Sequence, residues 1–538
     1  MKRHTTARSG ANRIARVAAV VALVAPLAGA RGQLTGHVNG TPKLVVFITI
    51  DQMRYDYLEK FASQYQGGLA RLMKGGAVFT NAYQDHANTE TAPGHATTLS
   101  GREPYRTGIV LNAVGVPDSR APMIGGGGPG ASPFRFRGGT LIDWMRVKDP
   151  RSRALSVSRK DRGAILPLGR AHESVYWYGT NGNFTTSQYY ADTLPNWVER
   201  FNARRLPQQY AGKAWLPLLP LSSYPEPDTV SVEDLGHEPA FPHTLSPDSA
   251  QAAKDLIAFP WMDDLTVQFA LEGVNQLRLG SGAATDLLAV SLSTTDAVGH
   301  RFGMASREMH DQMVRLDRSL GVLFDSLYKL RDSSTIVFAL TADHAVTLAP
   351  ELAKVAPGKQ PPIRVDLNDF VTKFYRSLVA RGVDTAGFDF QDAILFLDRP
   401  SFERAHVNVD SVARAFADDV KREPGVFRAD LFSAIQTADT THDPIARRWR
   451  HAIPPDIPAA VVITLNQGSV WGSYAAGIHG SPWDDDGHVP MVFYGPGIRP
   501  GRYDEFARVV DLAPTLAFLL KVTPTDALDG HVLKSALR

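Results

Sequence analysis

The sequence of 538 residues contains no cysteine, so neither disulfide bonds nor thiolate metal sites are available to this chain. Any transition metal must therefore bind to histidine, carboxylate or hydroxyl groups. A stripe of Lys and Arg is also missing, and 57 basic against 55 acidic residues give a formal net charge of only +2. This balance gives no support to a nucleic-acid partner. Long low-complexity tracts and internal repeats are absent too, and 44% hydrophobic residues suffice for a large globular core.

The first thirty residues contain no Asp or Glu. Basic residues come first, an apolar stretch covers residues 17–27, and Ala28-Gly29-Ala30 offers small residues for cleavage, an order typical of a secretory signal peptide. The alternative is an N-terminal membrane anchor, but the stretch is well short of the ~20 residues that cross a bilayer. We expect a signal peptide over 1–30, a linker over 31–41, and a periplasmic or secreted protein with no transmembrane segment after cleavage. The basic residues are Lys2, Arg3, Arg8, Arg13 and Arg16.

Four apolar runs, at residues 43–51, 286–296, 334–343 and 489–495, have the composition of buried strands, and the first three end in a carboxylate. Helical periodicity lies between them, at 67–74, 261–278 and 309–330. This alternation predicts an α/β fold with a central, mainly parallel sheet flanked by helices on both faces. Because ligands bind beyond the carboxyl ends of such strands, we expect Asp51, Asp296 and Asp343 to share one edge of the sheet.

Two stretches interrupt this alternation. Residues of about 115–250 are rich in Gly, Pro, Tyr and Trp, and residues of about 350–470 mix short helices with Pro-rich turns. We interpret both as insertions that cap the sheet edge within one catalytic domain over 42–538. They are not interpreted as independent domains, because the candidate ligands fall on either side of them.

Histidines accompany two of the strand-end acids. Asp296-Ala-Val-Gly-His300 places an imidazole four residues after a carboxylate, and Asp343-His344 makes the two adjacent. Each pair alone could be a structural hydrogen-bonded couple. Two such pairs together with Asp51 favour a metal site, and carboxylate oxygen with neutral imidazole nitrogen is a ligand set that suits zinc.

A third element is Thr91-Ala-Pro-Gly-His95, at the start of a helix of small residues. A threonine hydroxyl at a helix N-terminus lies where the backbone dipoles favour an alkoxide or a bound phosphate. Taken alone, the segment is equally consistent with a plain helix-capping threonine.

Together these motifs resemble the alkaline phosphatase superfamily. The likeness is greatest to its type I phosphodiesterase/nucleotide pyrophosphatase branch and to the single-chain, phosphate-irrepressible bacterial alkaline phosphatases, and it runs from about residue 42 to the C-terminus. The matching residues are Asp51, Thr91-Ala-Pro-Gly-His95, Ser100-Gly101, Pro104, Gly108-Ile109, Asn112, Asp296, His300, Asp343-His344 and His479-Gly-Ser.

The resemblance implies a two-zinc phosphohydrolase with a phosphothreonine intermediate. In this family the nucleophile precedes x-Pro-x-His and lies twenty-one residues before a phosphate-binding asparagine, which selects Thr91 with Asn112 and leaves Thr89 out of register. The last ligand is assigned to His479 because it lies in a His-Gly-Ser segment, with His488 as the alternative. One zinc would be held by Asp296, His300 and His479, and the other by Asp51, Asp343, His344 and the Thr91 oxygen.

The substrate class depends on a further likeness. Lys160 and Arg162 follow a short apolar strand at 154–157 and resemble the Lys-x-Arg element with which the phosphate-irrepressible enzymes contact a phosphate monoester. A monoester dianion carries one more negative charge than a diester, so two added cationic donors favour it. We therefore expect an alkaline phosphatase acting on small-molecule phosphate monoesters, with a phosphodiesterase or nucleotide pyrophosphatase as the alternative.

Two other functions fit less well. A sulfatase needs a Cys or Ser ahead of Pro-x-Arg, where this chain has Thr91-Ala-Pro-Gly-His95. A zinc-storing protein would have no use for Thr91, Asn112 and Lys160 in register.

Overall fold

A computed structural model describes residues 41–538 except 126–127, 356, 359 and 473–474. The signal peptide expected over residues 1–30 lies outside the described residues. Among the helices of the described ranges, none combines the length and the hydropathy needed to cross a bilayer.

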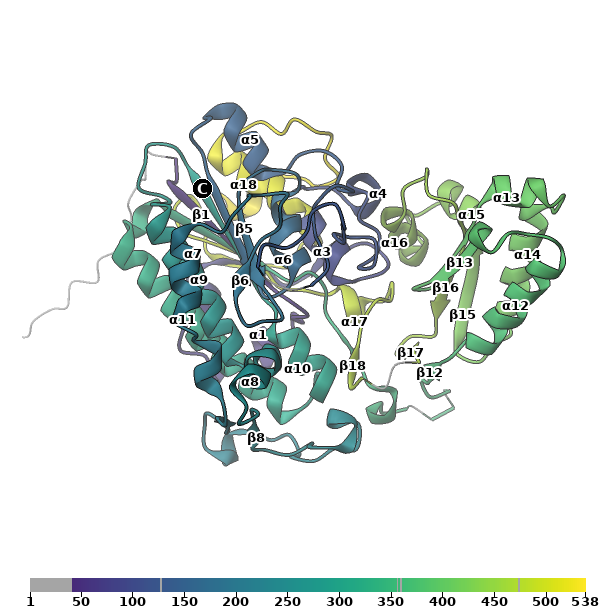
Figure 1. The fold of residues 1–538 in the computed structure, drawn as a ribbon, viewed down its shortest axis with the longest axis horizontal. Coiled ribbons are helices and arrows are strands. Elements are labelled where there is room, and N and C mark those ends of the chain that lie inside the picture. Colours follow the sequence, from purple (N-terminus) through teal and green to yellow (C-terminus); the bar gives the residue numbers. More distant parts are fainter. Residues whose placement is uncertain (1–40, 126–127, 356, 359, 473–474) are drawn as a thin grey trace, which may run out of the picture. The chain divides into compact units, whose positions relative to one another are not determined.

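The centre of the fold is a nine-stranded sheet with the order β20-β2-β19-β10-β1-β9-β4-β5-β6 (Figure 1). Its middle strands β10, β1, β9, β4 and β5 run parallel. They are almost entirely buried, as expected for strands covered by helices on both faces. The strands are β1 (Leu44–Ile50), β2 (Ala77–Phe79), β4 (Ala154–Ser158), β5 (Ser174–Tyr178), β6 (Phe184–Thr185), β9 (Asp286–Leu292), β10 (Ile336–Thr341), β19 (Met491–Tyr494) and β20 (Gly501–Tyr503).

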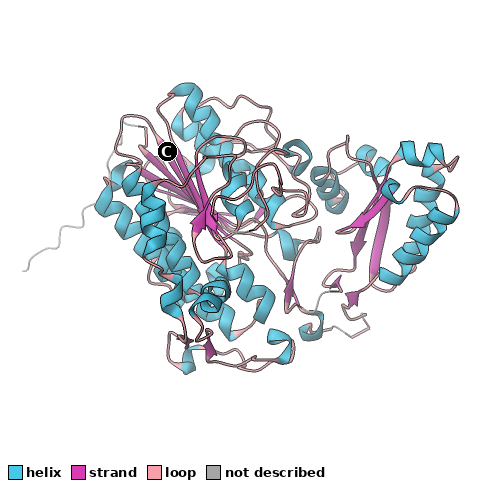
Figure 2. Cartoon of the chain, in the orientation of Figure 1, coloured by secondary structure: helices cyan, strands magenta, loops and turns pink. Residues whose placement is uncertain are grey.

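Helices cover both faces of this sheet (Figures 1 and 2). One group is α11 (Arg307–Leu330) with α2 (Gly68–Gly75) and α9 (Trp261–Gln276), which both pack on α11. A second group comprises α3 (Thr91–Thr98), α5 (Leu141–Lys148), α6 (Asp161–Ile165) and α18 (Leu512–Leu520). The mainly parallel α/β fold predicted from the sequence is thus confirmed. β19 pairs antiparallel with β10, a direction that an apolar run does not encode.

Residues of about 115–250 differ from the cap expected for them. They supply β4, β5 and β6, which are hydrogen-bonded into the central sheet next to β9. The strand at 154–158 is fully buried, so its apolar residues belong to the main core. Lys160 therefore follows a strand of the central sheet itself.

Residues of about 350–470 form a lobe, called here the inserted lobe, with a hydrophobic core of its own. Its antiparallel sheet has the order β13-β14-β16-β15 and is covered by α12 (Asn368–Ala380) and α14 (Val409–Val420) (Figure 2). The lobe core also includes Ala87, Val110 and Leu111 of the main body, so the two pack directly together. The strands are β13 (Phe388–Gln391), β14 (Ile394–Leu397), β15 (Val426–Leu431) and β16 (Ala459–Leu465).

A buried ionic cluster joins this lobe to the main body. From α16 (Pro444–Ala452), Arg447 donates two hydrogen bonds to Asp85, and Nδ1 of His451 bonds to the Asp85 carbonyl. The carboxylate of Glu103 lies 3.5 Å from Arg508 Nη1 and 3.8 Å from His451 Nδ1. Its side chain is 1% exposed, and neither oxygen accepts a hydrogen bond from the described residues. Burial raises the pKa of Glu103 to about 7 from 4.5, with the negative charge of Asp85 adding to the effect and the positive charges of His451 and Arg508 opposing it.

This raised pKa predicts a pH-dependent loss of stability. Folding favours the neutral carboxyl, so the penalty is absent below about pH 4.5 and grows as the pH rises through about 7. At pH 8.5 the penalty is roughly 3 kcal/mol. We expect Glu103→Gln to raise the melting temperature by about 3 °C at pH 8.5 and to change it little at pH 4.5. The exposed Glu199→Gln on α7 (Asn196–Ala203) is the matched control, and an equal shift at both pH values would contradict the prediction.

Candidate active site

Three carboxylates meet at the C-terminal edge of the parallel strands. β1 pairs in register with β9 on one side and β10 on the other, so the residues that follow these strands come out side by side. Asp51 follows β1, Asp343 follows β10, and Asp296 lies in the first turn of α10 (Thr294–Phe302), which follows β9. The edge predicted from the sequence is therefore the one observed.

Three histidines complete this cluster, and each is oriented by a backbone carbonyl. Nδ1 of His300 bonds to Gly477 O at 2.8 Å, Nδ1 of His344 to Ala345 O at 2.9 Å, and Nδ1 of His479 to Thr89 O at 2.8 Å. Because a carbonyl only accepts, each Nδ1 carries the proton and each Nε2 keeps its lone pair. The three Nε2 atoms are therefore available as ligands.

The Nε2 atoms point at the carboxylates. His344 Nε2 lies 3.6 Å from Asp51 Oδ1 and 3.7 Å from Asp343 Oδ2. His300 Nε2 lies 3.2 Å and His479 Nε2 3.8 Å from Asp296 Oδ1. Two triads of this cluster have ligand atoms within 4.8 Å of one another. They are Asp51 with Asp343 and His344, and Asp296 with His344 and His479.

The charges of the cluster suit metal ligands. Burial opposes ionisation of Asp296, but the Lys160 ammonium and His300 outweigh it and hold the pKa of Asp296 well below its usual range. Burial, with the neighbouring His344 and His300, lowers the pKa of His479 well below 6.5 and keeps its imidazole neutral. Burial also raises the pKa of Asp51, reinforced by the charges of Asp296 and Asp343. Three acids this close repel one another unless a cation lies among them.

Thr91 is the first residue of α3, and its side chain is buried beside the cluster. Asn112 braces this helix start, since its Oδ1 accepts a hydrogen bond from Ala92 N at 2.8 Å. Glu90 in turn accepts a hydrogen bond from Asn112 N at 2.7 Å. His95 Nδ1 lies 2.9 Å from Thr91 O and 3.0 Å from Asp343 Oδ2. The helix start is thus tied both to the asparagine and to one carboxylate.

Lys160 lies at the centre of the site. Its Nζ donates to Asp296 Oδ2 at 2.6 Å and to Thr91 Oγ1 at 3.2 Å, and it lies 2.7 Å from Asp51 Oδ2. Arg162 differs, because its guanidinium lies 3.6 Å from Asp161, and no hydrogen bond links it to Thr91 or Asn112 within the described part of the chain. The structure therefore brings Lys160 to Thr91 but leaves Arg162 at the border of the site.

The alternative ligand His488 lies elsewhere. Its Nε2 bonds to Thr80 O at 3.0 Å, and its ring stacks between Tyr55 and Tyr83. His479, by contrast, stacks on His344 with ring centroids 3.7 Å apart.

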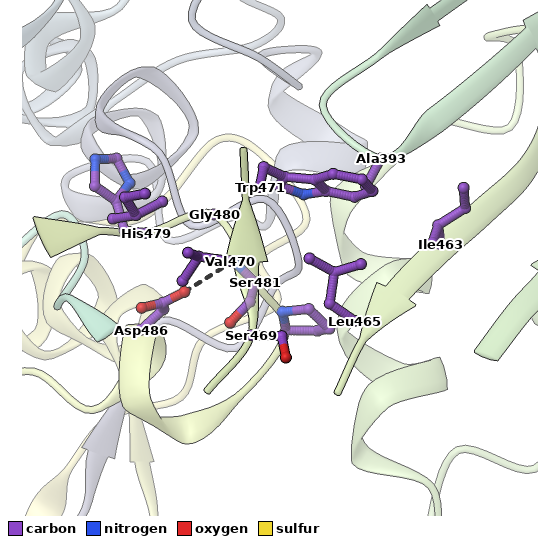
Figure 3. A pocket seen from close by; sticks show the side chains of 12 residues that line it. Ala393, Ile463, Leu465, Ser469, Val470, Trp471, His479, Gly480, Ser481 and Asp486 are labelled. Atoms are coloured by element: carbon purple, nitrogen blue, oxygen red, sulfur yellow. Dashed lines mark hydrogen bonds between the residues drawn. The ribbon is translucent and has the colours of Figure 1, made fainter. Parts of the chain in front are cut away.

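The inserted lobe reaches the loop that carries His479. Figure 3 shows a pocket between them, with Trp471 and Ala393 along one side and Ile463 and Leu465 of β16 along another. His479 lies at the far end of this pocket, where the Ser481 N–H donates to Asp486 (Figure 3). The lobe and the ligand loop thus share a packed boundary.

The profile of type I phosphodiesterases and nucleotide pyrophosphatases matches residues 45–356, which include three of the four ligand segments and the Thr91 helix. The chain belongs to this family.

Its relatives in the family include alkaline phosphatases. Alkaline phosphatase PhoV of Synechococcus elongatus is 30% identical over 522 residues, covering 92% of this chain and 93% of PhoV. Alkaline phosphatase PafA of Elizabethkingia meningoseptica is also 30% identical over 522 residues, covering 89% of this chain and 92% of PafA. The prediction of an alkaline phosphatase superfamily enzyme is confirmed.

Solved structures of PafA match the fold of this chain over most of its length. The wild-type crystal structure has a TM-score of 0.85 at 28% identity and covers 93% of this chain and 99% of PafA. A PafA variant has a TM-score of 0.86 with the same identity and coverage. In that variant one threonine is replaced by serine, and an asparagine, a lysine and an arginine are replaced by alanine.

Sequence reasoning missed several residues of this site. Gln52 and Glu90 contact proposed site residues but follow no metal or phosphate motif. Arg159, next to Lys160 in the sequence, also reaches the site, with its Nη2 3.6 Å from Asp296 Oδ2. His95 belongs to the Thr91 motif, and its contact with Asp343 gives it a role in holding that carboxylate.

Proposed function

We propose that this chain is a two-zinc alkaline phosphatase that hydrolyses phosphate monoesters through a phosphothreonine intermediate on Thr91. The observation that carries the proposal is the position of the Thr91 hydroxyl. It lies at a helix N-terminus, 3.2 Å from the Lys160 ammonium and beside a cluster of three carboxylates and three histidines. This arrangement places a nucleophile, a cationic donor and metal ligands within reach of one phosphoryl group.

Unpaired polar atoms at the site fit metal ions. Oδ1 of Asp51 and Nε2 of His344 are buried and accept no hydrogen bond from the described residues. Buried acceptors without partners are costly, and a divalent cation would satisfy both atoms. The donor set, oxygen and imidazole without sulfur, suits zinc.

The residues proposed to hold zinc are assigned in two groups. One group is Asp296, His300 and His479, and the other is Asp51, Asp343, His344 and the Thr91 oxygen. When bound, zinc would lower the pKa of the Thr91 hydroxyl and neutralise negative charge on the leaving oxygen.

The reaction has two steps. First, Thr91 Oγ1 bonds to phosphorus as the bond to the leaving oxygen breaks, and the alcohol departs with a proton. Second, water attacks the phosphothreonine, inorganic phosphate is released, and Thr91 regains its hydroxyl proton. Lys160 donates to the phosphoryl oxygens from beside Thr91, and Asn112, held by Glu90 and by Ala92 N, is placed to donate its Nδ2–H to them. Arg162 is proposed as a third donor.

The comparison with PafA supports these four residues. The threonine and asparagine of the PafA variant are twenty-one residues apart, and its lysine and arginine are two apart. Thr91 with Asn112 and Lys160 with Arg162 have the same separations. The cationic pair favours a monoester dianion over a diester monoanion. For this reason we propose a phosphatase and not a phosphodiesterase.

A comparison of matched aryl phosphate monoesters and methyl aryl phosphate diesters, with zinc present, tests this choice. We expect kcat/KM for the monoester to exceed that for the diester by at least about 10²-fold, on the scale of added oxyanion donors. A diester rate equal to or above the monoester rate would instead establish a phosphodiesterase at the same site.

The proposed location is outside the cytoplasm. The basic and apolar N-terminal pattern supports export, and the predicted cleavage near Ala30 can be checked by N-terminal sequencing of the mature protein.

A further inference from the structure

Gln52 connects the two groups of carboxylates at the active site. Its backbone N–H donates to Asp343 Oδ1 at 3.1 Å, and its side-chain amide Nε2 donates to Asp296 Oδ1 at 3.2 Å. The residue directly follows Asp51 and is fully buried. One residue therefore contacts a carboxylate of each proposed zinc group and is covalently joined to a third.

The backbone of Gln52 is held in an unusual conformation. Its φ of 67° lies in the left-handed region, which is uncommon for residues other than glycine, asparagine and aspartate. Glycine would adopt this conformation without cost, so a buried glutamine here is explained by what its side chain does. Such conformations persist where the surroundings impose them, and they cluster at functional sites.

The absence of a side chain at Gly299 leaves room for the Gln52 amide. Gly299 lies inside α10, between Asp296 and His300, where glycine is less favourable than alanine. A Cβ at Gly299 would lie 1.7 Å from Gln52 Oε1. The helix that carries two proposed ligands thus lacks a side chain at the point where Gln52 passes.

We propose that Gln52 is a positioning residue that fixes Asp296 relative to Asp51 and Asp343, and so sets the spacing of the two metal ions. The inference rests on the proposed two-zinc function. Hydrogen bonds to ligating carboxylates orient them and raise metal affinity, typically by 10–100-fold. Gln52 extends this effect across both groups, because moving its backbone or its amide disturbs Asp343 or Asp296.

Three variants separate the parts of this role. Gln52→Asn keeps the backbone N–H and tolerates a positive φ, but its shorter side chain does not reach Asp296. Gln52→Gly relieves the backbone conformation and removes the amide, which protects it against failure to fold. Gly299→Ala leaves Gln52 in the sequence but displaces its amide. Gln312→Asn is the matched control, since Gln312 is a buried glutamine whose amide donates to Asp263, which is not a proposed ligand.

The measurement is zinc bound per chain and the rate of zinc release to a chelator, made on the zinc-loaded enzymes together with kcat and KM. For Gln52→Asn, Gln52→Gly and Gly299→Ala we expect faster release of one zinc by about 10–100-fold. We also expect a lower kcat with a smaller change in KM. Gln312→Asn should behave as wild type, and melting temperatures in excess chelator should be alike, which separates positioning from general packing.

A double-mutant cycle gives the sharpest result. Gly299→Ala should be costly in the wild-type background and nearly neutral in the Gln52→Gly background, where the methyl group finds room. Wild type with two zinc ions and variants that release zinc at the wild-type rate would overturn the role of Gln52 and leave the proposed function intact. A wild-type enzyme that binds no zinc would overturn both.

Discussion

Replacing Thr91 with alanine is expected to lower kcat for a phosphate monoester by at least about 10⁴-fold, the scale on which enzymes lose activity when a covalent nucleophile is removed. Alanine has no atom that can bond to phosphorus, whereas the rest of the site stays in place. Zinc per chain should remain as in wild type, because three other ligands, Asp51, Asp343 and His344, stay in that group. Acid quenching during turnover, followed by mass spectrometry, should detect a phosphorylated peptide with Thr91 in wild type and none in the variant.

Two controls accompany this variant. Thr91→Ser restores a hydroxyl at the same position and should recover most of the lost activity. Thr89→Ala tests the register of the motif: the Thr89 side chain bonds to Ser481 O, and its backbone carbonyl, which orients His479, is unchanged by the substitution. A much smaller loss is therefore expected for Thr89→Ala. Retention of activity by Thr91→Ala with phosphate found at Thr89 would refute the assignment of the nucleophile.

The strand-end acids were predictable because parallel strands impose a simple rule. Apolar runs that end in Asp51 and Asp343 leave no other place for the carboxylates than the C-terminal edge of the sheet, and the observed register of β1 and β10 agrees. Two of the histidines could be predicted by spacing, since His300 lies one helical turn beyond Asp296 and His344 adjoins Asp343, whereas His479 was expected only from the family resemblance. These features depend on local sequence and on a topology that local sequence implies.

Other features depend on contacts between segments far apart in the chain. A glutamine after a strand has no sequence signature. The role of Gln52 follows from the structure, in which its N–H donates to Asp343, 291 residues away in the chain. The antiparallel direction of β19 and the position of β4 next to β9 could not be predicted either. An apolar composition indicates that a strand is buried, but it does not indicate which strands pair with it. The separate core of the inserted lobe was missed for the same reason.

Lys160 and Arg162 show the limit of a motif. Their resemblance to a Lys-x-Arg element implies two phosphate donors, yet the two side chains differ in the structure. Lys160 lies among Thr91, Asp51 and Asp296, and Arg162 lies beside Asp161. Side-chain direction depends on the local charge, and the three carboxylates attract the nearer cation. The motif points to both cations, and the structure shows that only Lys160 contacts the Thr91 hydroxyl.

The double variant Lys160→Ala with Arg162→Ala is expected to lower kcat/KM for a monoester by at least about 10²-fold, as for the loss of oxyanion donors, and to lower that for a diester far less. The physical reason is charge, because the monoester dianion loses two cationic donors and a diester has one fewer charged oxygen to bind. From the positions of the two groups, Lys160→Ala alone should account for most of the monoester loss. Steady-state kinetics on both substrates with the single and double variants checks this order, and the exposed Lys74→Ala on α2 controls for loss of a surface cation.

Metal content decides how a loss of activity in these variants is interpreted. Lys160 lies within 2.7 Å of Asp51 and Asp296, so its removal could act on the zinc ligands instead of on the substrate. If Lys160 acts on the substrate, zinc per chain stays at the wild-type value and the monoester and diester rates fall unequally. If it acts on the ligands, zinc is lost and both rates fall together, because both reactions use the same metal site. Equal losses on the two substrates would therefore remove the charge argument for monoester preference, while leaving Thr91 as the nucleophile.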